Sequence, residues 1–263
     1  MKHRHLLLST LCSSLLIAGG DIAPAPVEPI IQTAQEEVSA WSYELEPYLF
    51  VSSMTGPAKI GRTPTLEIDM DFGSILENLD MGAMVHFEAH NTNGWGYWLD
   101  YGFMDLSSDI TGPVGGVTNA RVRQGILEAF ALYRQPLANG HFDYLAGIRW
   151  WDNDFDVKHN TLPVDVKIDE SWVDPVIGGR WTTNINESWI FSLHGSIGGF
   201  GVSSELTASG AVALRYVIND LVDLDLQYKA LWADYESGTR GTQDYFSYDV
   251  TTHGPVVGVI FKF

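Results

Sequence analysis

The residues most able to do chemistry are acids and bases that alternate with apolar residues along the chain. The acids are Glu44, Glu46, Glu88, Asp100, Glu128, Asp143, Asp174 and Asp225, and the bases are Arg134, Arg149, Arg180, Arg215, Lys229 and Lys262. Opposite charges held in a narrow, water-poor space must be paired. This set therefore predicts either a polar path or a charge-paired plug.

A second candidate is the pair His194 and Ser196, whose residue types suit ester hydrolysis by a hydroxyl that an imidazole activates. Both residues fall on the same side of one alternating segment, and no acidic partner is identifiable. An enzyme acting on membrane lipid would need this pair to face the lipid. We therefore favour two polar filling residues over a lipid-active hydrolase, and we expect no catalytic residue and no enzyme activity.

A repeat of two residues in the sequence predicts that β-strands position these side chains. From Trp41 onward, segments of about ten residues alternate between apolar and polar, which is the pattern of half-buried strands. The pattern predicts ten strands, at 41–51, 82–90, 95–105, 122–134, 142–151, 172–182, 189–200, 205–216, 223–234 and 247–263.

The connections between these strands alternate in length. Short links rich in turn residues are expected at 91–94, 135–141, 184–188 and 217–222, and longer links at 52–81, 106–121, 152–171 and 235–246, with one short exception at 201–204. Short turns at one end, long loops at the other and an even strand number are typical of an outer-membrane β-barrel. We predict an all-β, antiparallel up-and-down transmembrane barrel of ten strands, with eight strands as the alternative.

The two faces of the predicted strands support a membrane location. None of the positions assigned to the outer face is Asp, Glu, Lys or Arg, and a charge facing the middle of a bilayer costs about 2–4 kcal/mol. Aromatic residues gather on this face at the strand ends, which predicts two girdles at the membrane interfaces: Trp41, Trp95, Tyr133, Phe142, Trp181, Trp189 and Tyr216 near the short turns, and Phe103, Trp150 and Trp232 near the loops. A lipocalin would have the opposite arrangement, an apolar interior and a polar exterior.

The composition fits this class. The 263 residues carry 33 acids and 15 Lys or Arg, a formal charge of −18, which argues against a nucleic-acid partner. No apolar run is long enough for a membrane-spanning helix.

The N-terminus is typical of a secretory signal, because basic residues at 2–5 precede an apolar stretch at 6–18 and small residues near Gly20. We expect a signal peptide over 1–20 with cleavage near Gly20, an acidic, Pro-rich periplasmic tail over 21–40, and the barrel over 41–263. The single cysteine, Cys12, falls within the signal, so the mature chain is expected to fold without disulfides.

Four segments carry a resemblance to known proteins. At the C-terminus, Val257, Val259, Phe261 and Phe263 alternate and end on Phe, which resembles the assembly signal that the insertion machinery of outer-membrane barrels reads. The segments 71–82, 172–181 and 198–202 are similar to segments in a family of largely uncharacterised proteobacterial outer-membrane barrels, and the chain more distantly resembles OmpW-like small barrels. The resemblance implies a fold and a location, and it implies no activity.

Acids spaced two apart also occur in the predicted loops, as in Asp152, Asp154 and Asp156 and in Glu67, Asp69 and Asp71. Carboxylate oxygens suit hard divalent cations, but the glycine and bidentate glutamate of an EF-hand loop are absent. We expect no specific metal site and no cofactor. The expected partners are outer-membrane lipid, lipopolysaccharide, the barrel assembly machinery and divalent cations loosely held at the acidic loops.

Three functions follow, in order of preference. A barrel of about eight strands is filled by side chains and a porin needs about sixteen, so ten strands favour a structural plug or passage of very small solutes through a narrow, charge-paired lumen. The lumen residues expected to carry this role are Glu44, Glu46, Glu88, Glu128, Asp143, Arg149, Asp174, Arg180, Arg215 and Lys229. The alternatives are a surface binding or adhesion module that uses acidic loops and, third, the lipid-active hydrolase.

Overall fold

The computed structural model describes residues 39–62, 64–111, 117–160 and 165–263. The predicted signal peptide and nearly all of the predicted tail therefore lie outside the described residues. No helix in the described ranges is long and apolar enough to cross a membrane.

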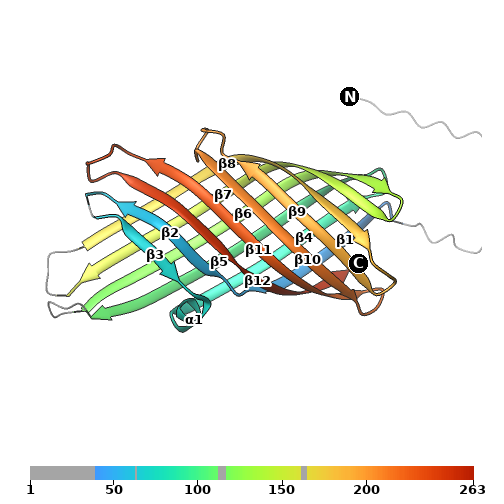
Figure 1. The fold of residues 1–263 in the computed structure, drawn as a ribbon, viewed down its shortest axis with the longest axis horizontal. Coiled ribbons are helices and arrows are strands. Elements are labelled where there is room, and N and C mark those ends of the chain that lie inside the picture. Colours follow the sequence, from blue (N-terminus) through green and yellow to red (C-terminus); the bar gives the residue numbers. More distant parts are fainter. Residues whose placement is uncertain (1–38, 63, 112–116, 161–164) are drawn as a thin grey trace, which may run out of the picture. The chain divides into compact units, whose positions relative to one another are not determined.

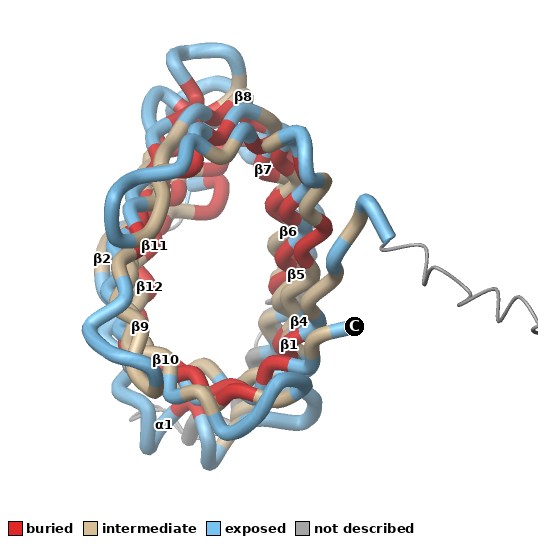
Figure 2. Tube along the Cα trace, turned by 90° about the vertical axis from the view of Figure 1, so that its right-hand side faces the viewer, coloured by how far each residue is buried: buried red, intermediate tan, exposed pale blue. Residues whose placement is uncertain are grey.

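Ten antiparallel strands form one closed barrel (Figure 1), and Figure 2 shows their ring viewed along the barrel. Each strand pairs with the next in order, and the first closes on the last, where Glu44 is opposite Lys262 and Tyr48 is opposite Gly258. The ten strands are β1 Trp41–Phe50, β4 Leu79–Asn91, β5 Trp95–Thr111, β6 Val117–Leu137, β7 Gly140–His159, β8 Asp165–Asn184, β9 Trp189–Gly198, β10 Leu206–Val217, β11 Val222–Ser237 and β12 Phe246–Lys262. The predicted ten-stranded barrel is confirmed, and the eight-stranded alternative is wrong.

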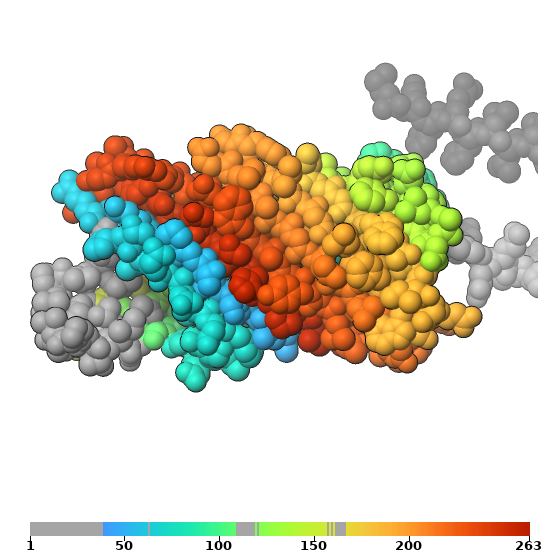
Figure 3. Space-filling model, in the orientation of Figure 1, coloured from blue at the N-terminus to red at the C-terminus, as the bar shows by residue number. Residues whose placement is uncertain are grey.

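Three further elements lie between β1 and β4: strand β2 Ser53–Ile60, strand β3 Leu66–Met70 and helix α1 Phe72–Glu77. Strand β2 pairs with the first half of β12 while β1 pairs with the second half, so β2 extends the wall beyond β1. In Figure 3 the blue segment of β2 lies beside the red C-terminal strand β12, and β3 lies on the other side of β2. The interpretation of 52–81 as a plain link is wrong, because Gly56 and Pro57 interrupt the alternation within β2 and hide the strand.

Helix α1 is capped at its start by Asp71, whose carboxylate accepts a 2.8 Å hydrogen bond from the backbone N–H of Ser74. This hydrogen bond holds the pKa of the Asp71 carboxyl below its usual range. The helix therefore begins at a defined point between β3 and β4.

The predicted short turns are confirmed, and asparagine side chains shape three of them. The side-chain oxygen of Asn186 accepts hydrogen bonds from the backbone N–H groups of Ser188 and Trp189, and Asn219 does the same for the two residues that enter β11. These local bonds replace the strand ladder where the chain reverses. Both ends of the barrel sequence lie at this end, where the backbone N–H of Tyr43 donates to the carbonyl of Phe263.

The turn between β6 and β7 depends on glycine, which gives a direct test. Gly140 has a φ of +125°, and a Cβ at this position would overlap the carbonyl oxygen of Thr182 on β8. We expect Gly140→Ala to destabilise the folded barrel by about 1–3 kcal/mol, measured by urea unfolding in lipid vesicles.

Gly195 provides the matched control for this prediction. It has ordinary strand backbone and open space where a Cβ would lie, so Gly195→Ala should leave stability unchanged or raise it by about 0.5–1 kcal/mol. Equal losses in the two variants would contradict the assigned role of Gly140.

Strands β5 to β8 continue well beyond their predicted ends, so the interpretation of 106–121 and 152–171 as loops is wrong. The alternation continues through both regions, but the chemistry of the two faces is exchanged. On the outside, Arg121 bonds Asp105 at 2.5 Å and Arg123 pairs with Asp154. On the inside lies an apolar core that joins strands β5 to β8 to β2, β11 and β12: Met54, Ile60, Met104, Leu106, Trp151, Trp172, Leu231, Ala233, Tyr235, Phe246, Tyr248 and Val250, with Ile75 of α1 also in the cluster.

The barrel thus has two zones with opposite faces. The zone next to the short turns, here called the belt, is apolar outside, with large exposed side chains such as Leu49, which is 72% exposed, and polar inside. The other zone, here called the extension, is charged outside and apolar inside. The arrangement that would mark a lipocalin is therefore present, but only in the extension.

Aromatic side chains surround the belt where the girdles were predicted. At the turn end, the rings of Trp95 and Tyr133 lie 5.3 Å apart, and those of Trp189 and Tyr216 lie 4.8 Å apart. At the border with the extension, the indole of Trp232 donates a 2.7 Å hydrogen bond to Asp249. An indole with one apolar and one polar side suits a membrane interface.

Candidate functional site

The interior of the belt holds three groups of ion pairs that together cross the barrel. The group nearest the short turns joins four strands. Arg215 on β10 binds Glu44 on β1 through two hydrogen bonds of 2.9 and 3.1 Å, and lies 3.7 Å from Asp223 on β11. Asp223 also accepts a 2.7 Å hydrogen bond from Lys262 on β12.

The second group centres on Arg180 of β8, which binds two carboxylates. Its guanidinium bonds Glu88 on β4 at 2.5 and 2.8 Å and Asp143 on β7 at 2.7 Å, and it stacks on the ring of Trp98 at 4.7 Å. Arg134 on β6 donates hydrogen bonds of 2.8 and 2.9 Å to the two carboxylate oxygens of Asp143, one of which also accepts from Arg180. These fork-shaped contacts satisfy most of the donors and acceptors of the group.

The third group lies toward the extension. Lys229 on β11 lies 3.2 Å from Asp100 and 3.6 Å from Glu128, and Arg149 binds Glu128 at 2.6 and 2.9 Å. The hydroxyl of Tyr48 donates a 2.9 Å hydrogen bond to Asp100. Arg149 is fully buried, and two further N–H groups of its guanidinium donate to the hydroxyls of Thr207 and Ser196.

Two residues of the predicted lumen set have no basic partner within the described residues. Asp174 lies in the extension, where it accepts hydrogen bonds from the indoles of Trp151 and Trp172 and from the backbone and hydroxyl of Ser204. Glu46 lies in the belt and is buried against Gly258. The structure brings the other eight residues of the set into the three groups above.

Sequence reasoning missed several members of these groups. His86 lies 2.8 Å from Glu88 and 3.3 Å from Asp100, and His90 lies 2.6 Å from the other oxygen of Glu88. Both histidines have the same strand parity as Glu88, and Asp223 has the parity of Asp225, so the alternation could have identified them.

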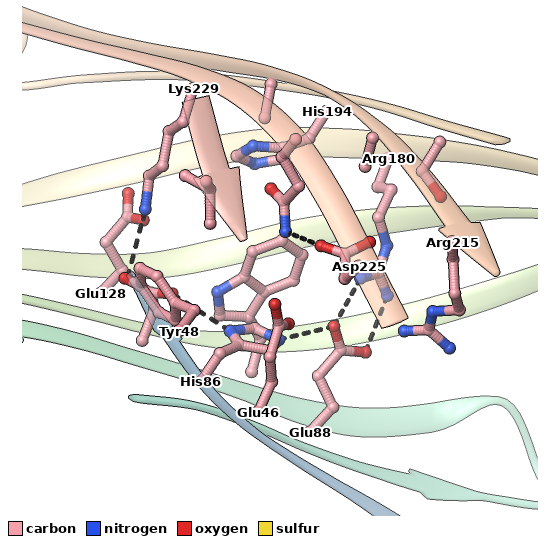
Figure 4. A pocket seen from close by; sticks show the side chains of 17 residues that line it. Glu46, Tyr48, His86, Glu88, Glu128, Arg180, His194, Arg215, Asp225 and Lys229 are labelled. Carbon is pink, nitrogen blue, oxygen red and sulfur yellow. Dashed lines mark hydrogen bonds and ion pairs between the residues drawn. The ribbon is translucent and has the colours of Figure 1, made fainter. Parts of the chain in front are cut away.

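Two cavities lie end to end within the lumen. The first, of about 70 Å³, lies among the ion pairs of the belt (Figure 4), and the second, of about 40 Å³, lies toward the extension with mostly apolar walls. Both are lined by Tyr48, Asp100 and Lys229, so this bonded trio forms the boundary between them. The apolar core of the extension lies beyond the second cavity.

The side chains of His194 and Ser196 both face the lumen, but they do not form a catalytic pair. The hydroxyl of Ser196 bonds Arg149 at 2.9 Å and Ser209 at 2.7 Å, while the Nε2 atom of His194 has no hydrogen-bond partner among the described residues. A nucleophile needs a hydrogen bond to its base. The geometry gives no support to a hydrolase at this position.

The acids spaced two apart lie on the outside of the extension. Asp154 pairs with Arg123 and Asp156 with Lys158, and nowhere in the described ranges do three metal-ligating side chains gather into a site. Loose binding of divalent cations stays a prediction.

The C-terminal residues Val257, Val259, Phe261 and Phe263 all point outward from β12 and are exposed. Phe261 is opposite Leu45 on β1, and the ring of Phe263 stacks on Tyr43 at 5.7 Å. The segment therefore forms the seam at which the barrel closes. Its role in assembly stays a prediction.

No protein-family model matches the sequence, and no curated protein matches it. Among solved structures, the translocator domain of the autotransporter NalP from Neisseria meningitidis is 10% identical, with a TM-score of 0.49, covering 87% of this chain and 90% of that one. The outer membrane protein OprG from Pseudomonas aeruginosa is 9% identical, with a TM-score of 0.36 and coverage of 86% and 96%. The transport unit of the autotransporter AIDA-I from Escherichia coli is 8% identical, with a TM-score of 0.42 and coverage of 89% and 94%. The likeness to outer-membrane barrels agrees with the resemblance expected from the sequence, and it says nothing of function.

Proposed function

We propose that this chain is an integral outer-membrane β-barrel with a closed lumen, that it is not an enzyme, and that its role in the envelope is structural. The uncharged exterior of the belt, its aromatic girdles and the contrast between short turns and long strand extensions support the location. Lipid and lipopolysaccharide would then surround the belt, and the assembly machinery would read the segment that ends at Phe263. Cleavage near Gly20 is tested by N-terminal sequencing of the mature protein.

The observation that best supports the proposal is that side chains fill the lumen in both zones of the barrel. Ion pairs cross it in the belt, and stacked aromatic rings fill it in the extension, where Trp172 lies 3.8 Å from Tyr235 and 5.5 Å from Trp151 between ring centroids. Among the described residues, the lumen contains cavities of about 70 and 40 Å³. Such volumes hold a few water molecules, which favours a lumen that is closed to solutes.

The test is single-channel conductance of the refolded protein in a planar lipid bilayer, with folding verified by heat-modifiable migration on gels. We expect no discrete conductance steps from the folded barrel. Reproducible steps that change in size when Glu88 or Arg180 is neutralised would contradict the proposal and establish passage of small solutes through the lumen.

A surface binding module is a second candidate, and the extension is the observation that favours it. Its strands extend beyond the belt, pack on an internal apolar core and present a charged outer face, which would form a platform outside the membrane. Asp152 and Ser171 are opposite each other on β7 and β8, so a two-residue Asn-Gly turn can join them and remove the rest of that hairpin. Loss of cell adhesion with an intact barrel would support binding, and unchanged adhesion would contradict it.

A further inference from the structure

Inside the belt, carboxylates outnumber the Lys and Arg side chains. Among the described residues, eight carboxylates face six Lys or Arg side chains, and each of the six bases lies within 4.0 Å of at least one carboxylate. The acids are Glu44, Glu46, Glu88, Asp100, Glu128, Asp143, Asp223 and Asp225, and the bases are Arg134, Arg149, Arg180, Arg215, Lys229 and Lys262. Imidazolium groups at His86 and His90, which lie 2.8 and 2.6 Å from Glu88, and at His141, 3.6 Å from Asp143, would add positive charge beside those two carboxylates.

Two of these carboxylates have no ion pair among the described residues. They are Glu46 and Asp225, whose carboxyl groups lie within hydrogen-bonding reach of each other. Both are more than nine-tenths buried, and both line the larger cavity (Figure 4). Gln227 donates a hydrogen bond to Asp225, and one oxygen of Glu46 accepts no hydrogen bond.

The same cavity is lined by two further polar groups without partners. The indole N–H of Trp98 and the Nε2 atom of His194 make no hydrogen bond in the described chain, although both side chains are more than nine-tenths buried. Their rings lie 5.0 Å apart between centroids. Buried polar atoms are seldom left unpaired, so their convergence on one cavity indicates an occupant that accepts and donates hydrogen bonds.

The size of the cavity limits that occupant. At about 70 Å³ it has about half the volume of the engineered cavity of about 150 Å³ that binds benzene. It therefore accommodates a single small ion and a few water molecules. Calcium takes six to eight oxygen ligands and magnesium a strict octahedron, which two carboxylates and so few waters do not supply.

We propose that this cavity binds one small monovalent cation between Glu46 and Asp225, hydrated by water molecules that complete the hydrogen bonding of Trp98 and His194. The cation supplies a positive charge beside two buried carboxylates that have no ion pair, and a water molecule accepts from the Trp98 N–H. The site goes beyond the proposed structural role, because a barrel with or without conductance can hold such an ion.

The test uses the whole refolded barrel in lipid nanodiscs, with sodium or ammonium chloride compared against N-methylglucamine chloride at the same ionic strength. N-methylglucamine is too large for the cavity, so it controls for screening. We expect the indole ¹H–¹⁵N resonance of Trp98, assigned with Trp98→Phe, to shift saturably with sodium or ammonium and to stay constant in N-methylglucamine. The thermal midpoint should be higher in the small cations, because a ligand that binds only the folded state stabilises it.

Two paired variants localise the effect. Glu46→Gln combined with Asp225→Asn should abolish both the shift and the difference in thermal midpoint. The matched control, Glu205→Gln combined with Asp249→Asn, removes the same charge outside the lumen and should retain both. A wild-type Trp98 resonance and thermal midpoint that are the same in all three salts would overturn the proposal, leaving a proton shared by Glu46 and Asp225. A shift that survives the lumen double variant would overturn it as well.

Discussion

Replacing Arg180 with methionine is expected to destabilise the folded barrel by about 3–5 kcal/mol. Among the described residues, Arg180 is the one base that binds both Glu88 and Asp143, and both carboxylates are almost completely buried. Removing one partner of a buried pair leaves an uncompensated charge, which costs far more than the pair itself contributes. Methionine keeps much of the volume over Trp98, so the loss reports mainly on charge.

The loss is measured by urea unfolding in lipid vesicles and compared with that of Arg123→Met. Arg123 pairs with Asp154 on the outer surface of the extension, where an exposed ion pair contributes about 0–1 kcal/mol. Combining Arg180→Met with Glu88→Gln and Asp143→Asn should restore part of the stability. An Arg180→Met barrel as stable as the Arg123→Met barrel would contradict the assignment of Arg180 as the centre of the belt network.

The second large effect is expected at Trp172, in the core of the extension. Its ring stacks on Tyr235 and Trp151, and its indole N–H bonds Ser204 at 2.9 Å and lies 3.2 Å from Asp174. Trp172→Ala leaves a cavity in a packed core and should cost about 3–5 kcal/mol. It also removes one of the donors that stabilise the buried Asp174 carboxylate.

Limited proteolysis of the refolded variant, together with urea unfolding, locates this effect in the extension. Val202→Ala is the control, because Val202 lies in the same loop as Ser204 and is 69% exposed. Conductance should stay absent in Trp172→Ala, since the ion pairs of the belt still cross the lumen. Resistance to protease equal to that of the wild type would show that the aromatic stack does not stabilise the extension.

The alternation of residue types was sufficient to predict ten strands, their faces and their turns, because the apolar exterior of a membrane barrel leaves few alternatives. The alternation did not predict the strands of the extension, where the charged face lies outside and the apolar face inside. Asp105 and Asp154 are outward-facing acids. In the belt, an outward-facing acid would mark the end of a strand, so the residue pattern predicts loops where the structure has the extension. The signal was present in inward residues such as Trp151 and Phe155, which continue the strand parity of Arg149.

The partners within the lumen could not be predicted in the same way. Strand parity places Glu88 and Arg180 inside, but they are 92 residues apart and meet across the lumen, at a height set by the tilt and register of the closed barrel. Asp174 shares its parity with Arg180, yet it lies within the aromatic core and bonds indoles instead of bases. Composition gives the approximate charge balance. Only the three-dimensional register identifies which two carboxylates have no ion pair.

The exchange of faces between belt and extension also constrains how the protein is made. In the outer-membrane location proposed above, the outward-facing Asp105, Arg121, Arg123 and Asp154 of the extension would have to cross hydrocarbon if a finished barrel were pushed through the bilayer. Hairpins that cross before the β1–β12 seam closes, where Phe261 is opposite Leu45, would avoid this cost. The exchange of faces thus favours export of the distal hairpin tips before the cylinder seals.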